Sequence, residues 1–508
     1  MMLTKMTPWL RRSMAPTRRS ILRGTSAQWT TKCAFSSASD VTDTALRVCI
    51  VGSGPAGFYA AKYLLKEHDG VRVDMIEALP TPYGLVRSGV APDHPEVKSV
   101  MNDFEKVAAE ARFDFLGNVR VGDDISLSEL KQHYHAVVLA YGAAGDRELG
   151  IPGEHLAGVL SARAFVNWYN GHPKFRDLPV DLSGKTAVIF GQGNVAVDCA
   201  RILTKSVDEL ATTDISQHAV DVLRNSNIKK VYLIGRRGSA QAAFTMKEIR
   251  ELTKLTNVSC VVDPADMKAS LNESSQQEIN EQRAKKRMNE LLTKVSSEFG
   301  KESTEARQVQ IKFLSAPVEL LADPENPEKV GNVRVEKTKL QGEPNRQHAV
   351  GTGEFETIPA SLVLRSIGYK SQPLEDAPFD TKRNVLANDQ GRLIDVKGNG
   401  EQVVGLYCSG WVKRGPSGII GTNIIDARET VTSIVEDIAS GKILKPASSN
   451  GLETIKQIIL GKKPEKQLVS WKDYERLNDE ETKRGEAVGK PREKFTSVEE
   501  MLRIVAEK

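Results

Sequence analysis

The sequence is poor in cysteine and lacks long hydrophobic runs. Its five cysteines are far apart, with no CxxC pair and no metal-ligand spacing, so it predicts no redox disulfide, disulfide framework or zinc site. No segment approaches the roughly 18 apolar residues of a membrane span, and we therefore expect no transmembrane helix. A reducing compartment fits these thiols best. The cysteines are Cys33, Cys49, Cys199, Cys260 and Cys408.

Acidic residues are absent from positions 1–39, which carry seven basic residues and several serines. This composition is typical of a mitochondrial transit peptide, whereas a secretory signal needs a continuous apolar stretch. A disordered basic tail is the alternative interpretation. We expect positions 1–39 to direct the protein to the mitochondrial matrix and to take no part in the fold.

The chain as a whole has the composition of a folded protein, with 40% hydrophobic and 27% charged residues. Its 508 residues suffice for two or three domains that each bury a core. A net charge of +4 is small for this length and gives no indication of nucleic-acid binding.

The stretch VGSGPAG, which follows an apolar strand and opens a helix, is a G-x-G-x-x-G dinucleotide motif. Gly52 permits the tight turn, Gly54 lets the backbone approach a pyrophosphate, and Gly57 allows close helix packing. The next strand ends at Glu77, whose carboxylate can accept hydrogen bonds from the hydroxyls of a ribose without a 2′-phosphate. A turn needed for packing alone would not explain Glu77. A proline and Ala56 inside the turn favour FAD over NAD.

A second unit of the same kind begins with GQGNVA at Gly191. The alanine in place of a third glycine is usual for NADP sites. The second strand of this unit ends in Arg236 and Arg237, 45 and 46 residues after Gly191, because residues 204–227 lengthen the crossover. A guanidinium pair can hold a 2′-phosphate that an acidic residue would repel, so this unit predicts NADP(H). An exposed pair that faces solvent is the alternative.

Two glycine-containing crossings mark the boundaries between domains. The strand at 136–140 runs into a Gly/Pro-rich stretch, and 361–369 has the same character. This arrangement indicates that one domain is inserted into the other. We expect an α/β fold of two Rossmann-like domains, with 45–145 and 370–508 binding FAD and 146–369 binding NADP.

Sites for FAD and NADPH together imply a flavin-dependent NADPH oxidoreductase, whose flavin must pass its electrons on. No CxxC pair is present to receive them. A flavin can also release electrons singly, which suits a one-electron protein acceptor. A flavin monooxygenase or a diaphorase stays open, as does a protein that binds both nucleotides without turnover. The basic run at 283–287 would steer an acidic acceptor, although a solvated helix face explains it equally well.

The stretch LYCSGWVKRGPSGIIGTN forms a third strand, glycine turn and helix. We expect Gly418 to Ile420 to open that helix and to present backbone N–H groups and the positive end of the helix dipole to the flavin. Trp411 lies in the turn and would stack near the flavin or the nicotinamide. A tryptophan of the core is the alternative.

These stretches together resemble the adrenodoxin reductase family of ferredoxin reductases, from about residue 46 to the C-terminus. The matching segments are VGSGPAGFYAA, PYGLVRSGVAPDHPEVK, FGQGNVAVDCARIL, GRRGSAQAAFTMKE, RSIGY, GWVKRGPSGIIGTN and GKPREKF. The resemblance implies a flavoprotein of the glutathione-reductase type that passes electrons from NADPH through FAD to a 2Fe–2S ferredoxin in one-electron steps. A monomer is our default expectation.

The resemblance also implies which residues serve each partner. Those at FAD are Ala56, Glu77, Leu85, Val121, Trp411, Gly418, Ile419 and Ile420. Those at NADP are Gln192, Gly193, Asn194, Val195, Arg236, Arg237, Glu248 and Gly418. His94 and Asp198 would form a polar pair near the nicotinamide and a path for protons, with a purely structural role as the alternative. The segment 283–287 matches the family less well, and on charge alone we expect an acidic ferredoxin to dock near Arg250, Arg283, Lys285, Lys286 and Arg287.

Overall fold

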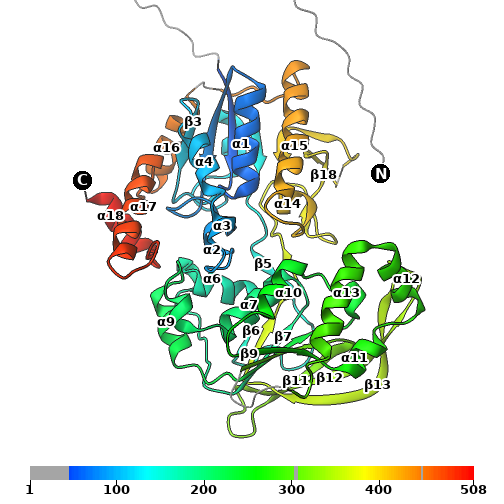
Figure 1. The fold of residues 1–508 in the computed structure, drawn as a ribbon. Helices are drawn as coiled ribbons and strands as arrows, with labels where there is room; N and C mark the ends of the chain where they lie inside the picture. Colours follow the sequence, from blue (N-terminus) through cyan, green and yellow to red (C-terminus); the bar gives the residue numbers. More distant parts are fainter. Residues whose placement is uncertain (1–44, 302–306, 397, 448–449, 508) are drawn as a thin grey trace, which may run out of the picture. The chain divides into compact units, whose positions relative to one another are not determined.

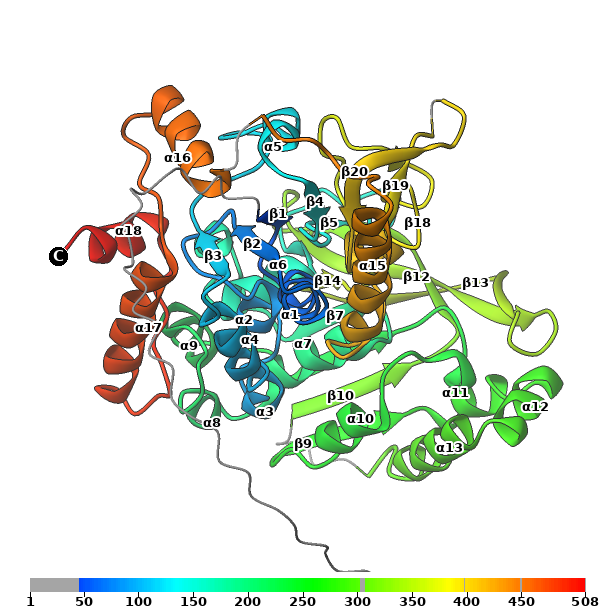
Figure 2. The ribbon, with the colours of Figure 1, turned by 90° about the horizontal axis from the view of Figure 1, so that it is seen from above.

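A computed structural model of the protein describes residues 45–301, 307–396, 398–447 and 450–507. The predicted targeting segment at 1–39 lies outside these residues. The described chain is built around two large β-sheets, one above the other in Figure 1 and seen from above in Figure 2. Across the described ranges, no helix is long and apolar enough to cross a membrane.

The first sheet has seven strands in the order β18-β19-β20-β4-β1-β2-β3. Strands β20, β4, β1, β2 and β3 run parallel, and β19 and β18 are added antiparallel at one edge. The nearly continuous apolar sequence of β1 fits burial on both faces, with Ile50 in one core cluster and Val51 in the other. The bounds are β1 Leu46–Val51, β2 Val71–Ile76, β3 Phe113–Leu116, β4 Ala136–Leu139, β18 Asn388–Asp389, β19 Arg392–Ile394 and β20 Gln402–Cys408.

Helices cover both faces of the first sheet, and α1 packs against α15 on one of them. This sheet and its helices are called the first-sheet part below. A small hairpin, β16 Phe379–Asp380 and β17 Val385–Leu386, belongs to it. Its helices are α1 Pro55–Glu67, α2 Leu85–Ser88, α3 Pro95–Lys98, α4 Met101–Ala108, α5 Leu127–His133, α14 Trp411–Arg414, α15 Thr422–Ala439, α16 Gly451–Lys462, α17 Trp471–Glu486 and α18 Val498–Ala506.

The second sheet has six parallel strands in the order β6-β14-β7-β8-β10-β9. Helices cover one face, and an antiparallel sheet of β11, β12 and β13 covers the other. Together these elements are called the second-sheet part. Its large strands are β6 Val159–Ser161, β7 Thr186–Phe190, β8 Lys230–Ile234, β9 Val258–Val262, β10 Arg307–Lys312, β11 Ser315–Ala322, β12 Val330–Gln341, β13 His348–Pro359 and β14 Leu362–Arg365.

The helices of the second-sheet part include three in the long crossover between β7 and β8, the helix that follows the glycine turn and two more. They explain why the arginine pair follows its glycine turn at such an unusual distance. Three helices fill the polar region 264–296, as its composition predicts. The helices are α6 Ala162–Tyr169, α7 Asn194–Thr204, α8 Val207–Leu210, α9 Gln217–Arg224, α10 Met246–Leu252, α11 Pro264–Ala269, α12 Glu273–Glu281 and α13 Arg283–Ser296.

The chain passes between the two parts twice, and the two passages lie side by side. Strand β5, Gly145–Asp146, pairs antiparallel with β15, Tyr369–Lys370, in a ribbon of two residues a side. These passages coincide with the two glycine-containing crossings in the sequence. The α/β fold with two dinucleotide-type sheets is therefore confirmed.

Candidate functional site

The first glycine turn leaves open space where a phosphate would lie. Gly52 has φ +105°, and a Cβ atom on Gly57 would overlap the carbonyl oxygen of Gly52, so strand β1 and helix α1 touch through these glycines. A Cβ on Gly54 would meet nothing within 4 Å. Gly54 is the N-cap of α1 and offers no side chain to the helix N–H groups, which are therefore free to bind an anion.

Glu77 lies at the end of β2, directly beside this turn. Its Oε2 accepts hydrogen bonds from the backbone N of Ser53 at 3.0 Å and from the Ser53 hydroxyl at 2.6 Å, and its Oε1 accepts one from the N of Leu79 at 3.0 Å. The carboxylate therefore holds the glycine turn in shape. It is half-exposed and keeps lone pairs for a ribose.

The third predicted segment packs onto the first turn. Gly410 follows β20 with φ +81°, and a Cβ atom there would overlap the side chain of Ala56. The Asp426 carboxylate accepts hydrogen bonds from the backbone N of Gly410 and from Arg414 at 3.0 Å. Asp426 was not predicted from the sequence, because it acts only through a turn that lies 16 residues away.

Helix α15 begins at Thr422, so the prediction that Gly418 to Ile420 open this helix was wrong by a few residues. These residues form the loop that leads into the helix, because Gly418 has φ +81°, outside the helical region. The Thr422 hydroxyl accepts the N–H of Ile419 at 3.1 Å, and the Ile419 side chain is 69% exposed. Trp411 donates from Nε1 to the carbonyl of Ser417 at 3.2 Å. The loop therefore presents an apolar side chain at the surface.

Two further residues assigned to FAD are half-buried. Leu85 begins α2 directly after Gly84, where a Cβ would lie 3.3 Å from the Cα of Gly54, so Leu85 is close to the first turn. Val121 packs against the core cluster on the other face of the first sheet.

The second glycine turn repeats the geometry of the first. Gly191 has φ +134°, while a Cβ on Gly193, the N-cap of α7, would meet nothing within 4 Å. Gln192 donates from Nε2 to the carbonyl of Lys312 at 3.0 Å, and Asn194 accepts through Oδ1 from the backbone N of Thr245 at 2.8 Å. These two side chains brace the turn against neighbouring segments, with Val195 half-buried behind them.

Arg236 and Arg237 are both exposed directly after β8. Their backbone carbonyls are occupied, since Arg236 accepts from the Thr338 hydroxyl at 2.8 Å and Arg237 from the N of Leu314 at 3.2 Å. Within the residues that the structure describes, neither guanidinium has an ion pair or hydrogen bond. Both are therefore available to an external anion.

A buried ionic cluster lies where the two parts meet. The Arg201 guanidinium, with its side chain 1% exposed, donates to Asp93 at 2.8 and 3.1 Å, to Asp198 at 2.7 Å and to Glu248 at 3.1 Å. Burial by itself would raise the pKa of Asp93, but Arg201 and Lys205 hold it at about 2. Burial raises the pKa of Asp198, although Arg201 opposes the shift.

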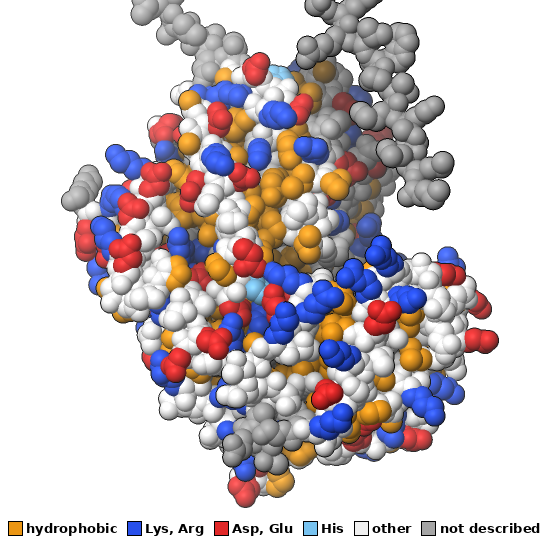
Figure 3. Space-filling model, viewed as in Figure 1, with side chains coloured by type: hydrophobic (Ala, Val, Ile, Leu, Met, Phe, Trp, Pro, Cys, Tyr) orange, Lys and Arg blue, Asp and Glu red, His pale blue; other side chains and the backbone are white. Residues whose placement is uncertain are grey.

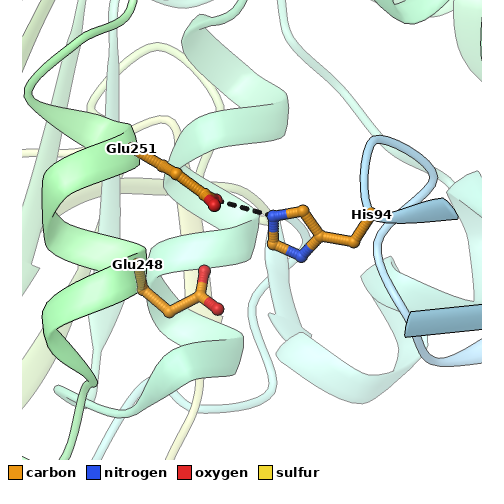
Figure 4. A group of neighbouring side chains, drawn as sticks. All are labelled: His94, Glu248 and Glu251. Atoms are coloured by element: carbon orange, nitrogen blue, oxygen red, sulfur yellow. Dashed lines mark hydrogen bonds and ion pairs between the residues drawn. The ribbon is translucent and has the colours of Figure 1, made fainter. Parts of the chain in front are cut away.

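His94 faces this cluster from the first-sheet part. Its Nε2 lies 2.6 Å from Oε2 of Glu251, and Figure 4 shows Glu248 and Glu251 of α10 pointing toward the imidazole. Thr245 caps α10 and accepts from the N of Glu248, which fixes both glutamates on one face of the helix. A cavity of about 340 Å³ opens beside His94, Glu251 and Arg201.

His94 and Asp198, which were expected to pair with each other, each bond to a different residue. In the described chain His94 bonds to Glu251 and Asp198 bonds to Arg201, so the two side chains share a cluster without a bond between them. Sequence reasoning missed Asp93, Arg201 and Glu251. The spacing of Asp198 and Arg201, three residues apart on a predicted helix, was the available signal.

The basic side chains that were predicted to lie near an acceptor differ in whether their charge is exposed or already paired within the protein. Figure 3 shows Lys and Arg side chains gathered over α10 and α13. Arg250 lies on α10, and the others are on α13; Arg250, Arg283, Lys286 and Arg287 are exposed. Lys285 instead donates to the buried Glu278 at 2.6 Å, so its charge is used within the protein.

Comparison with known proteins identifies the family of the chain. A family model described as pyridine nucleotide-disulphide oxidoreductase matches residues 46–259. The chain is 47% identical to the mitochondrial NADPH:adrenodoxin oxidoreductase of Arabidopsis thaliana over 93% of this chain and 97% of that protein. It is 46% identical to the human protein of that name, over 90% of this chain and 92% of the human protein.

A solved structure gives the same result. Mycobacterium tuberculosis FprA in complex with NADPH is 40% identical, covers 91% of this chain and 100% of its own, and superposes with a TM-score of 0.83. At these levels of identity and coverage, the chain belongs to the NADPH:adrenodoxin oxidoreductase family.

Proposed function

We propose that this protein transfers electrons from NADPH through FAD to a 2Fe–2S ferredoxin, one electron at a time. The chain is an FAD-dependent NADPH oxidoreductase of its family. The observation that carries the proposal is the contrast between Glu77 after one glycine turn and Arg236 and Arg237 after the other. One chain thus offers a site for an unphosphorylated adenosine and one for a 2′-phosphorylated adenosine.

We assign FAD to the first-sheet part, 45–145 and 370–508. The fit rests on the open space at Gly54 and on the uncapped N-terminus of α1, which suit a pyrophosphate. Glu77 would accept from the ribose. Leu85, Val121, Trp411 and Gly418 to Ile420 would line the rest of the site.

NADPH is assigned to the second-sheet part, 146–369. Gly193, at the N-terminus of α7, leaves room for the pyrophosphate, with Gln192, Asn194 and Val195 around it. Arg236 and Arg237 would bind the 2′-phosphate through charge-assisted hydrogen bonds. Bound FAD would supply a hydride acceptor for NADPH and a carrier that can release the electrons afterwards.

His94, Asp198 and Glu248 would lie at the nicotinamide end. Arg201 fixes Asp198 and Glu248, and the bond to Glu251 fixes the imidazole of His94. In this proposal a proton enters from the adjacent cavity and passes through the hydrogen-bonded side chains of Glu251 and His94 to reach the site. A proton path of this kind needs hydrogen-bonded titratable groups in a row.

The acceptor would be an acidic ferredoxin that docks on α10 and α13. Arg250, Arg283, Lys286 and Arg287 present unshared positive charge there, and long-range attraction would speed the encounter. The four cysteines of the described chain are free, and the sequence has no CxxC pair that could relay electrons. Relatives named as mitochondrial indicate a mitochondrial protein, and we propose the matrix and a monomer.

Ferredoxin dependence tests the proposal. NADPH-driven reduction of cytochrome c should be slow with the purified holoprotein alone and should rise at least tenfold when a mitochondrial 2Fe–2S ferredoxin is added. A rate that does not depend on ferredoxin would contradict the proposal. Rapid oxygen consumption or quinone reduction under the same conditions would favour a monooxygenase or a diaphorase.

A further inference from the structure

The covalent connection between the two parts is slender. The chain crosses in the ribbon of β5 and β15, which has two residue pairs. Two-stranded ribbons are only marginally stable by themselves, and short connections of this kind act as hinges between domains. The angle between the two parts must therefore be set by side-chain contacts.

Among the described residues, buried ionic links join the parts at two places. One is the pair of Arg201 and Asp93, which belongs to the site already described. The other lies away from both glycine turns, where Lys98 of α3 donates to Asp214 at 2.6 and 2.7 Å. Lys98 is 6% and Asp214 9% exposed, so water cannot replace either partner at low cost.

Asp214 also binds the C-terminal segment. Lys494 donates to Asp214 Oδ2 at 3.0 Å and to the carbonyl of Asn170 at 3.1 Å. Burial would raise the pKa of Asp214, but the two ammonium groups hold it well below its usual range. The Asp214 carboxylate of the second-sheet part thus forms ion pairs with Lys98 of α3 and with Lys494 of the C-terminal segment.

The tail that carries Lys494 is itself fixed to the first-sheet part. Arg87 of α2 makes a bidentate pair with Glu481 of α17 at 2.9 and 2.5 Å, and Glu481 also accepts the N–H of Phe495 at 2.9 Å. Gly485 has no room for a Cβ against the backbone of Arg492, so the segment folds back tightly on α17.

The same segment reaches the start of α9. Lys490 donates to the carbonyl of Ile215 and to Gln217, both at 3.1 Å, and Glu493 accepts from the backbone N of Gln217 at 3.1 Å. In Figure 1 the C-terminal helices lie on the side of the molecule where α9 is found, and Figure 2 agrees. Residues 487–497 therefore form a strap that links the two parts through side-chain contacts, in addition to the two-residue ribbon of β5 and β15.

We propose that Asp214 is a positioning residue for hydride transfer, because it locks the strap and α3 to the second-sheet part and so sets the distance between the two nucleotide sites. The proposal rests on the proposed function, in which one part holds FAD and the other NADPH. Hydride transfer needs reacting atoms about 3–3.5 Å apart, and a displacement of about 1 Å can lower the rate about 100-fold. Asp214 touches neither assigned nucleotide site, so its loss should spare binding.

The test is single-turnover reduction of the bound flavin by NADPH in anaerobic stopped flow. Asp214→Asn should lower the limiting rate at saturating NADPH at least tenfold, with the NADPH dissociation constant and FAD content within twofold of the parent. Asp214→Glu should recover much of the rate. Asp208→Asn is the matched control, because this exposed carboxylate of α8 pairs with Arg224 on the surface and should leave the rate unchanged.

An unchanged limiting rate in folded Asp214→Asn would overturn the proposal, as would a slow rate that follows loss of FAD or of NADPH affinity. If Asp214→Asn does not fold, Lys494→Gln carries the test with the same criteria, since it removes the bond between the strap and Asp214 while Lys98 still neutralises Asp214. The same measurement on the parent protein distinguishes failure of the positioning role from failure of the proposed function. If its flavin is not reduced by NADPH, the proposed function fails, whereas a fast parent and an equally fast variant refute the positioning role alone.

Discussion

Replacement of Arg236 and Arg237 by alanine should change the preference of the enzyme between NADPH and NADH. The two guanidinium groups are exposed and have no partner among the described residues, so their removal leaves no buried charge unpaired. The substitution also leaves intact the backbone carbonyls that anchor this segment to Thr338 and Leu314. The variant should fold normally and keep its FAD.

The magnitude follows from the number of charged hydrogen bonds that are lost. A hydrogen bond to a charged group contributes about 1.5–3 kcal/mol, and the lower end applies to exposed groups such as these. Two arginines at about 1.5 kcal/mol each give about 3 kcal/mol, which corresponds to a loss of somewhat more than 100-fold in kcat/KM for NADPH. NADH has no 2′-phosphate, so its kcat/KM should change less than about threefold.

Steady-state reduction of ferricyanide with each nucleotide measures this ratio without a protein acceptor. Flavin absorbance of the purified variant provides the control for folding and FAD content. Equal losses with NADPH and NADH would refute the reasoning, because the arginines would then act on the fold or on the nicotinamide rather than on the 2′-phosphate.

Three further changes probe the packing, the docking surface and the strap. Gly57→Ala should destabilise the protein by about 3 kcal/mol or more and lower its FAD content, because the added methyl group would overlap the glycine turn. Gly461→Ala in α16 is the control, because its methyl group would meet open space and should leave the thermal unfolding temperature unchanged. Arg287→Glu should raise the KM for ferredoxin severalfold and reduce its salt dependence, whereas Lys229→Glu, at an exposed position just before β8, should not; equal effects would contradict a local docking surface. Burial lowers the pKa of Lys494, although Asp214 opposes the shift, so the unfolded chain holds more protons than the folded protein in the alkaline range up to about pH 10.4, and stability should rise with pH there by at most about 1.4 kcal/mol per unit. Lys494→Met should reduce that rise in urea unfolding, and an unchanged slope would contradict it.

Sequence reasoning succeeded where the information is local. Gly52, Gly54 and Glu77 belong to one unit of strand, turn, helix and strand, and the structure brings them together as the motif predicts. The same holds for Gly191 and strand β8, which is followed closely by Arg236. Such units depend on short-range backbone geometry, which a motif records directly.

The sequence could not predict contacts between distant segments. Arg201 gathers carboxylates from three segments of the chain, and His94 finds Glu251 from the other part of the molecule. Asp214 and Lys494 are 280 residues apart in the chain, with no motif that links them. Buried ion pairs of this kind follow from the packing of whole domains, and no local pattern reports them.

Helix boundaries and surface charges were predicted less well. The loop at Gly418 precedes α15 because its positive φ is incompatible with a helix. In the sequence, Lys285 is indistinguishable from the other three basic residues at 283–287. In the structure it pairs with Glu278 of the preceding helix. A basic run therefore overstates the charge that is available to a partner.

Sequential anaerobic mixing tests the central claim most directly. NADPH is first mixed with the holoprotein, and an oxidised 2Fe–2S ferredoxin is then added while flavin absorbance and the electron paramagnetic resonance of the reduced cluster are followed. The account predicts bleaching of the flavin by NADPH, followed by its reoxidation as two ferredoxins are reduced for each NADPH consumed. A flavin that NADPH reduces but ferredoxin fails to reoxidise would contradict it.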